Sequence, residues 1–171
     1  MNYSKVFWIL FLMLAPAKTI LAQQQMVFYE DKEAGVAIKH PGNWTVEKAP
    51  LTAFVISKPP KSPHDYSENL SLVIDSAQGK TLAQYTDLYI KKISVERKGY
   101  KSVGTQTLKL GSYTFSKTIY KHTGDGHALQ TAHYICIRGN KAYNISCTST
   151  EATYAAFSQI FDDMVKSFTI R

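Results

Sequence analysis

The stretch that decides the fold is Tyr134-Ile-Cys-Ile-Arg-Gly-Asn-Lys-Ala-Tyr-Asn-Ile-Ser-Cys147. Apolar residues fill both arms, and Gly139-Asn140 stands between them, which is the pattern of a hairpin with a two-residue turn. Such a turn pairs Arg138 with Lys141 and sets the register of both arms. Because both faces of this hairpin carry apolar side chains, we expect both sides of its sheet to be covered.

The same register predicts the state of the two cysteines. Cys136 faces Tyr143, and Cys147 faces Ala132, so both thiols point to one face but lie four residues apart along the ladder. At about 3.3 Å per residue, this separates them by roughly 13 Å. A disulfide needs Cα atoms within about 7 Å of each other. We therefore predict two buried free thiols.

Further strands are expected upstream of the hairpin. The pattern predicts four consecutive antiparallel strands over 101–110, 113–122, 127–137 and 142–148, with turns at Gly111-Ser112 and Thr123-Gly-Asp-Gly126. Four more strands are predicted over 27–29, 35–39, 51–57 and 69–75.

Two amphipathic helices are available to cover the sheet. Thr81 and Gln84 fit a capping box that opens a helix, which Gly99 ends. Apolar residues at spacings of three and four predict a second helix from about Glu151 to Lys166. We expect Asp162-Asp163 on its polar side as surface charge. The predicted fold class is therefore α+β, an α/β/α sandwich with a central antiparallel sheet.

The first 22 residues have the features of a secretory signal peptide. Lys5 precedes an apolar run from Val6 to Ala15, which is about ten residues long, whereas a spanning helix needs roughly 20. Ala22 is a small residue at the exit. We expect cleavage after Ala22, export to the periplasm or secretion, and a single domain over 23–171. An uncleaved membrane anchor is the alternative.

The chain is basic, with 20 Lys and Arg, 13 Asp and Glu and a net charge of +7. Lys5 and Lys18 leave with the signal peptide, so 18 basic and 13 acidic residues remain, a net charge of +5. One interpretation is attraction to an anionic envelope surface or an acidic protein, and the other is an ordinary solvated helix face. Only three residues are arginine, the usual phosphate-binding residue, so we expect no nucleic acid as partner.

The sequence contains no recognisable catalytic motif. Gly-x-Ser-x-Gly, His-Glu-x-x-His and phosphate-loop patterns are all missing. His122, Asp125, His127 and His133 form the one histidine-rich stretch, but their spacing matches no metal motif. We expect these four residues at a solvent-exposed hairpin tip, and we expect no metal and no cofactor. Trp44 is expected to fill the core.

The segment Gly35-Val-Ala-Ile-Lys-His-Pro-Gly-Asn-Trp44 resembles the start of PsbP-like domains, in which a strand is followed by Pro and then Trp. Tyr143-Asn-Ile-Ser-Cys-Thr148 is similar to the last strand of that family, and Ser167-Phe168 to the end of its last helix. The resemblance spans about residues 27–171. It implies an α/β/α sandwich and binding or accessory work, as in photosystem II extrinsic subunits and many exported bacterial proteins.

We therefore expect an exported, non-enzymatic binding or accessory protein, monomeric and not membrane-spanning after cleavage. Its partner would be an unknown protein or an anionic envelope surface. The proline-rich loop at 58–68 is stiffened by its prolines and loses less entropy on binding. With the basic end of the first helix, it gives the expected partner surface: Lys58, Lys61, His64, Tyr66, Arg97, Lys98 and Lys101. The alternatives are a small exported hydrolase or a small-ligand carrier with a site between sheet and loop, and a solvated loop without a role.

Overall fold

The computed structural model describes residues 25–171, which form ten strands and two helices in two sheets. The predicted signal peptide, residues 1–22, lies outside the described residues. The strands of the N-terminal half are β1 (Met26–Asp31), β2 (Val36–Pro41), β3 (Thr45–Glu47), β4 (Phe54–Ser57) and β5 (Asn69–Ser76). The remaining elements are α1 (Leu82–Glu96), β6 (Lys101–Leu110), β7 (Tyr113–Gly124), β8 (His127–Arg138), β9 (Lys141–Thr150), α2 (Tyr154–Lys166) and β10 (Thr169–Ile170).

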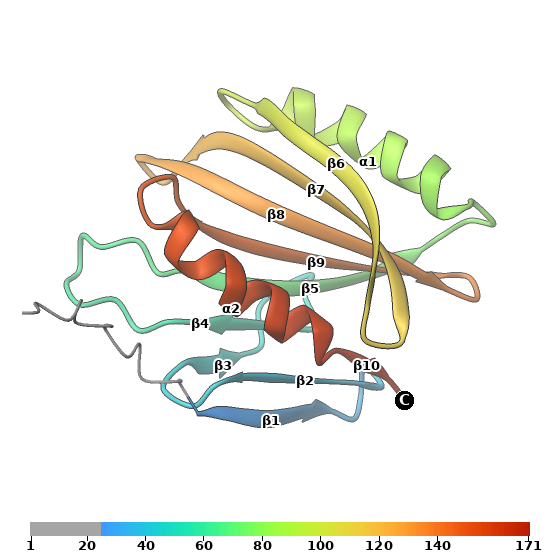
Figure 1. Cartoon of the computed structure of the whole chain (residues 1–171), viewed down its shortest axis with the longest axis horizontal. Coiled ribbons are helices and arrows are strands. Elements are labelled where there is room, and N and C mark those ends of the chain that lie inside the picture. The colour runs from blue at the N-terminus through green and yellow to red at the C-terminus, as the bar shows by residue number, and fades with distance from the viewer. Residues whose placement is uncertain (1–24) are drawn as a thin grey trace, which may run out of the picture.

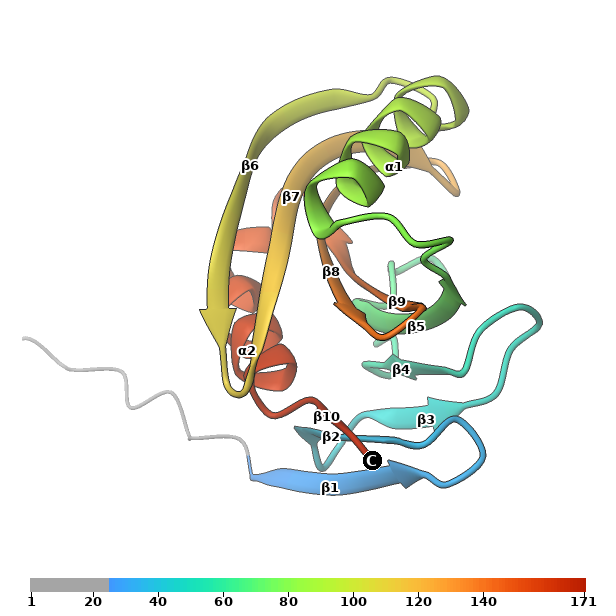
Figure 2. The same ribbon diagram turned by 90° about the vertical axis from the view of Figure 1, so that its right-hand side faces the viewer.

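Seven strands form one antiparallel sheet in the order β3-β4-β5-β9-β8-β7-β6. The sheet lies between the two helices (Figures 1 and 2), because α1 packs on β7 and β8 from one side and α2 packs on β9 from the other. The four consecutive antiparallel strands predicted from the sequence are β6 to β9. The expected α+β class and the α/β/α sandwich are confirmed.

The sequence pattern assigns all strands to one central sheet. In the structure, β1 and β2 form a second, smaller sheet. β1 and β10 both pair antiparallel with β2, and the amide of Arg171 donates to the carbonyl of Gly35 at 2.8 Å. β10 has two residues and β3 has three, too few for a hydrophobic period to be visible. The short sheet closes one side of the core and joins the beginning of the described chain to its end.

The core lies between the main sheet, the small sheet and α2. Its largest fully buried side chains include Phe54, Tyr134, Phe161 and Phe168. Trp44 is buried against α2, with its ring centroid 6.2 Å from that of Phe161. The expectation that Trp44 fills the core is confirmed.

The register predicted for the central hairpin is confirmed. Arg138 pairs with Lys141, Cys136 lies opposite Tyr143, and Cys147 lies opposite Ala132. Both thiols are free and buried. The two-residue turn therefore determines which side chains of β8 and β9 face α2.

Of the acidic pair on α2, Asp163 is exposed as expected, whereas Asp162 is not simple surface charge. The ammonium of Lys117, which is buried on β7, lies 2.7 Å from the carboxylate of Asp162, and the Tyr134 hydroxyl donates to the same oxygen. Asp162 therefore compensates a cation under the helix, because a buried charge is costly without a partner. The helix itself begins at Tyr154, three residues later than predicted, after a turn at 151–153.

Two turn glycines allow a matched test of this packing. Gly111 and Gly139 have almost the same left-handed backbone, with φ of 58° and 59°. A Cβ at Gly111 would lie 2.5 Å from the carbonyl oxygen of Lys166, whereas a Cβ at Gly139 would meet nothing within 4 Å. We expect Gly139→Ala to cost about 1 kcal/mol of unfolding free energy through backbone strain alone. Gly111→Ala should cost at least twice as much, because α2 has to shift. Urea unfolding measures both values, and equal losses would contradict the close packing of this turn on α2.

Candidate functional site

Three segments that are distant in sequence meet at one end of the main sheet. The Tyr66 ring, in the β4–β5 loop, packs edge-on against His127 at 5.6 Å, and the side-chain amide of Asn69 donates to the Tyr66 hydroxyl at 3.1 Å. The amide of Thr123 donates to the carbonyl of Lys98 at 2.8 Å, which ties the α1–β6 connection to the β7–β8 turn. The proline-rich loop, the β7–β8 turn and the α1–β6 connection therefore form one surface, at the left of Figure 1, which we call the basic end.

The seven residues expected to form the partner surface do not all have the same environment. Lys61, His64, Arg97, Lys98 and Lys101 are exposed. Tyr66 is half-buried against His127. Lys58 donates to the carboxylate of buried Glu68 at 3.0 Å and lies 4.9 Å from the Phe157 ring centroid, so it holds the base of the loop and is not open for a partner.

The face of the sheet under α1 is covered, as the hairpin pattern predicts, and Ile135 and Ala142 are buried there, but polar side chains share this face. Its buried side chains include His122, Thr131, His133 and Asn144. The sequence placed His122 and His133 at an exposed hairpin tip, and this is wrong. β7 and β8 are 12 residues each, and both histidines pair within their ladder, His122 with Leu129 and His133 with Thr118. Of the four residues assigned to the tip, Asp125 alone is exposed.

His133 is the centre of this polar layer. Its ring is 2 % exposed and stacks on the Tyr89 ring of α1 with a centroid distance of 3.9 Å. The hydroxyls of Tyr89 and Ser146 lie 3.0 and 2.7 Å from Nδ1, and the Asn144 amide oxygen lies 3.4 Å from Nε2. Burial lowers the pKa of His133 to about 3, so the ring is neutral at physiological pH.

His122 extends the polar layer toward the basic end. Its Nε2 lies 3.0 Å from the Thr131 hydroxyl, which in turn lies 3.0 Å from the Thr148 hydroxyl. Burial, together with the positive charge of Arg97, lowers the pKa of His122 below its ordinary value. Its Nδ1 is buried and has no hydrogen-bond partner within the described part of the chain.

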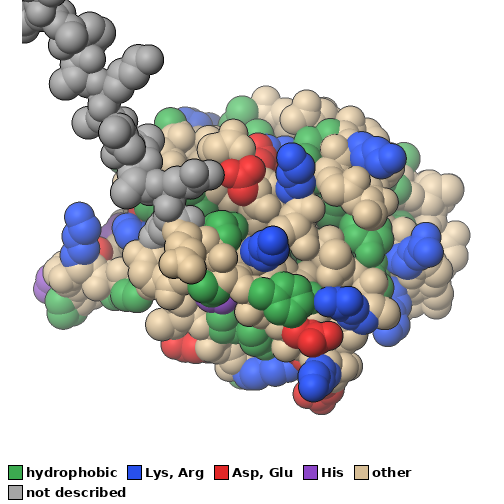
Figure 3. Space-filling model, turned by 60° about the horizontal axis from the view of Figure 1, so that its bottom comes forward, with side chains coloured by type: hydrophobic (Ala, Val, Ile, Leu, Met, Phe, Trp, Pro, Cys, Tyr) green, Lys and Arg blue, Asp and Glu red, His purple; other side chains and the backbone are tan. Residues whose placement is uncertain are grey.

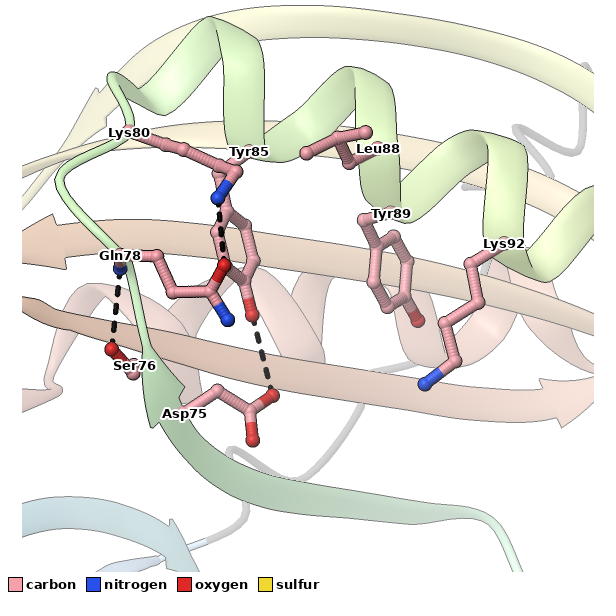
Figure 4. A pocket seen from close by; sticks show the side chains of 8 residues that line it. All are labelled: Asp75, Ser76, Gln78, Lys80, Tyr85, Leu88, Tyr89 and Lys92. Carbon is pink, nitrogen blue, oxygen red and sulfur yellow. Dashed lines mark hydrogen bonds between the residues drawn. The ribbon is translucent and has the colours of Figure 1, made fainter.

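The polar layer opens to solvent in a groove between α1 and β5 (Figure 4). The groove has a volume of about 410 Å³ and is lined by Asp75, Ser76, Gln78, Lys80, Tyr85, Leu88, Tyr89 and Lys92. Tyr85 and Tyr89, one turn apart on α1, both point toward the sheet. The Tyr85 hydroxyl donates to Asp75 at 3.2 Å, and the Asn144 side-chain amide donates to the same carboxylate oxygen at 3.3 Å.

The geometry of α1 follows from its capping box, which is confirmed. The Thr81 hydroxyl accepts from the amide of Gln84 at 3.3 Å, and the Gln84 side chain accepts from the amide of Thr81 at 3.0 Å. This fixes the first turn of the helix and hence the direction of Tyr85 and Tyr89. Sequence analysis missed the groove, although alternate residues at Thr131, His133, Asn144 and Ser146 already marked one polar face of the hairpin.

Both thiols are remote from this chemistry. Burial raises the pKa of Cys136 to about 12 and that of Cys147 well above its usual value, so both stay protonated at neutral pH. Within residues 25–171, no three His, Cys, Asp or Glu side chains gather in a way that fits a metal ion. The groove therefore offers hydrogen-bonding groups and ring faces, which suit non-covalent binding.

The buried His133 makes stability depend on pH. The ordinary pKa of 6.5 applies in the unfolded chain, whereas the folded value is about 3. Between these values the unfolded chain binds more protons, so the free energy of unfolding rises by up to about 1.4 kcal/mol for each unit by which the pH increases. Above pH 6.5 His133 is neutral in both states, and its full contribution to the free energy of unfolding is present.

We expect His133→Gln to flatten the dependence between pH 4.5 and 6.5, although it lowers stability at pH 7. Thermal unfolding across this range measures the slope, and exposed His64→Gln is the matched control, with the slope of the unmodified protein. A His133→Gln protein that keeps the full slope would contradict the prediction.

Neither α1 nor α2 combines the length and the apolar character that crossing a membrane requires, and these are the two helices of the described residues.

Comparison with known proteins identifies the architecture. No family model matches the chain, and no curated protein matches it either. Solved structures do match. The cyanobacterial PsbP (CyanoP) from Synechocystis sp. PCC 6803 is 15 % identical with a TM-score of 0.63, and the match covers 88 % of this chain and 95 % of that one.

Two further structures have the same architecture. LpqN, described as involved in cell envelope biogenesis of Mycobacterium tuberculosis, is 11 % identical with a TM-score of 0.66, over 85 % of this chain and 90 % of that one. PA94 from Pseudomonas aeruginosa, a protein of unknown function, is 15 % identical with a TM-score of 0.61, over 85 % and 97 %. The segment 35–44 had indicated a PsbP-like domain. The fold that carries the groove and the basic end is the PsbP-like fold.

Proposed function

We propose that this protein is an exported accessory protein that binds an acidic partner protein in the cell envelope through its basic end. The observation that carries the proposal is the meeting of the proline-rich loop, the β7–β8 turn and the α1–β6 connection on one surface. Tyr66 and His127 join the loop to the turn, and the Lys98 carbonyl joins the connection to it.

The basic end is already ordered before a partner arrives. The Lys58–Glu68 pair closes the base of the loop, and the Asn69 amide holds the Tyr66 hydroxyl. Less conformational entropy is then lost on binding than a flexible loop would lose. Tyr66 provides an aromatic side chain of the kind enriched at binding hot spots.

The exposed lysines of this end have no ion-pair partner in the described part of the chain, although two exposed acids, Asp65 and Asp125, lie on the same surface. Lys61, Lys98 and Lys101 form no ion pair with any described residue. On the face formed by the small sheet, Figure 3 shows basic side chains scattered among acidic and apolar ones. Unpaired lysines attract an acidic surface and raise the rate of encounter.

The comparisons support a binding role. The similar structures include PsbP (CyanoP) and the envelope-biogenesis protein LpqN, neither of which is described as an enzyme. The basic net charge of the chain is consistent with an anionic partner. A periplasmic or secreted location follows from the predicted signal peptide.

Crosslinking in the native compartment tests the binding surface. We expect the double variant Lys61→Glu and Lys98→Glu to lose at least tenfold in captured partner, because both exposed charges are reversed. The matched control is Lys39→Glu with Lys141→Glu, which reverses two exposed lysines away from the basic end. Equal capture by both double variants would show that binding does not use this surface. Lys58 and Tyr66 stay unchanged, so that the loop keeps its base and its contact with His127.

The proposed export has a direct measurement. We expect the protein recovered from the periplasm or the medium to begin at Gln23, because the apolar run ends in a small residue at Ala22. N-terminal sequencing or intact mass reads the first residue. A protein recovered there that still begins at Met1 would contradict cleavage.

A further inference from the structure

The groove between α1 and β5 is a second surface with its own chemistry, and it runs along α1 from Lys80, just before the helix, to Lys92. Two tyrosine rings, Tyr85 and Tyr89, form its inner wall (Figure 4), and Leu88, 49 % exposed, adds apolar surface between them. Lys80 and Lys92 stand on either side of these rings. The wall thus combines ring faces with cations and acceptors, all drawn from α1 and the segment that leads into it.

The ring positions are fixed by the polar layer behind them. Tyr89 stacks on the buried ring of His133 and lies 3.0 Å from its Nδ1. Tyr85 donates to Asp75 and accepts from the Asn144 side-chain amide at 3.2 Å. Burial raises the pKa of both tyrosines above the ordinary value, so their hydroxyls remain protonated. A wall that is already rigid loses little entropy when a ligand packs on it.

The groups left open define the ligand. Asp75 uses one carboxylate oxygen for Tyr85 and Asn144, and its other oxygen accepts nothing from the described residues. Lys80 donates to the Gln78 side-chain oxygen at 2.8 Å, which leaves the Gln78 amide nitrogen facing outward as a donor. Lys92 has no ion pair and no side-chain hydrogen bond among residues 25–171. One open acceptor, one neutral donor and two cations without an ion pair to the described residues, Lys80 and Lys92, thus surround the rings, and of the two cations only Lys92 has no side-chain hydrogen bond there.

Three simple ligand classes leave part of this set unused. A bare anion pairs with Lys92 but is repelled by Asp75 and ignores the rings. A neutral sugar donates hydroxyl groups to Asp75 but leaves Lys92 unpaired. A flat aromatic acid covers the rings and pairs with Lys92 but gives Asp75 no donor.

We propose that this groove binds an acidic sugar, a pyranose that carries a carboxylate. The C–H face of the sugar ring packs on the Tyr85 and Tyr89 side of the groove, hydroxyl groups donate to the open oxygen of Asp75, and the carboxylate pairs with Lys92. This is a different site from the basic end, so the proposal does not depend on the proposed partner protein.

The test is a titration of the purified full chain with methyl glucuronide, followed by amide chemical-shift changes in a nitrogen-15 NMR spectrum. We expect saturable shifts centred on α1 residues 85–92 with a dissociation constant in the millimolar range, as befits one small ring in an open groove. Methyl glucoside, which has the same ring without the carboxylate, and acetate, which has the carboxylate without the ring, should each bind at least tenfold more weakly.

Two lysine variants test whether Lys92 binds the carboxylate of the ligand. Lys92→Ala should weaken methyl glucuronide binding about tenfold, because it removes a charge-assisted contact. Lys91→Ala changes the neighbouring exposed lysine, which does not line the groove, and should bind as the unmodified protein does. The proposal is overturned if methyl glucuronide causes no saturable shifts, if methyl glucoside or acetate binds equally well, or if the two variants behave alike. Because both lysines are exposed, neither variant should disturb the fold.

Discussion

The pairing of β8 with β9 determines what each helix covers. Side chains alternate along a strand, so a slip by one residue would exchange the two faces of the sheet. In the observed register, Tyr134, Cys136 and Tyr143 face α2, whereas His133 and Asn144 face α1. One side of the sheet is therefore a dry core, and the other is a hydrogen-bonded layer. The groove depends on the second side because Tyr85 and Tyr89 of α1 line it, and the basic end depends on it because the connection that follows α1 contributes Arg97 and Lys98.

The two helices, α1 and α2, are held on the main sheet by different kinds of interaction. Under α2, aromatic rings such as Phe161 and Phe168 are removed from water, and non-directional burial contributes most of the stabilisation. Under α1, buried polar groups lie beside apolar ones such as Ile93 and Ile135, and each polar group is stabilising only while its partners stay in place. The stack of Tyr89 on His133 is the point where the helix, the sheet and the groove meet. The position of α1 on the sheet is thus set by specific contacts. These contacts also hold in place the side chains of α1 that line the groove.

Much of the fold was predictable because local signals agreed with the global arrangement. Gly139-Asn140 predicted the hairpin register, and Thr81 with Gln84 predicted the start of α1. The small sheet was not predictable, because β10 is too short to show a period and pairs with a strand far away in sequence. The burial of His122 and His133 was missed because a histidine in a strand gives no local sign of what will cover it. At the basic end, the sequence could find exposed cations but could not show that Lys58 is paired with Glu68.

The three-stranded sheet also constrains the order in which the molecule can be finished. β1 and β2 receive their third strand from Thr169 and Ile170, and Arg171 closes the arrangement on Gly35. A chain that is made, or that crosses a membrane, from its N-terminus delivers β10 after all the other described strands. One edge of β2 must then stay unpaired until Thr169 and Ile170 arrive, since a contact between residues so distant in sequence forms late. β10 thus acts as a latch, which completes the small sheet only when both halves of the domain are on the same side of the membrane.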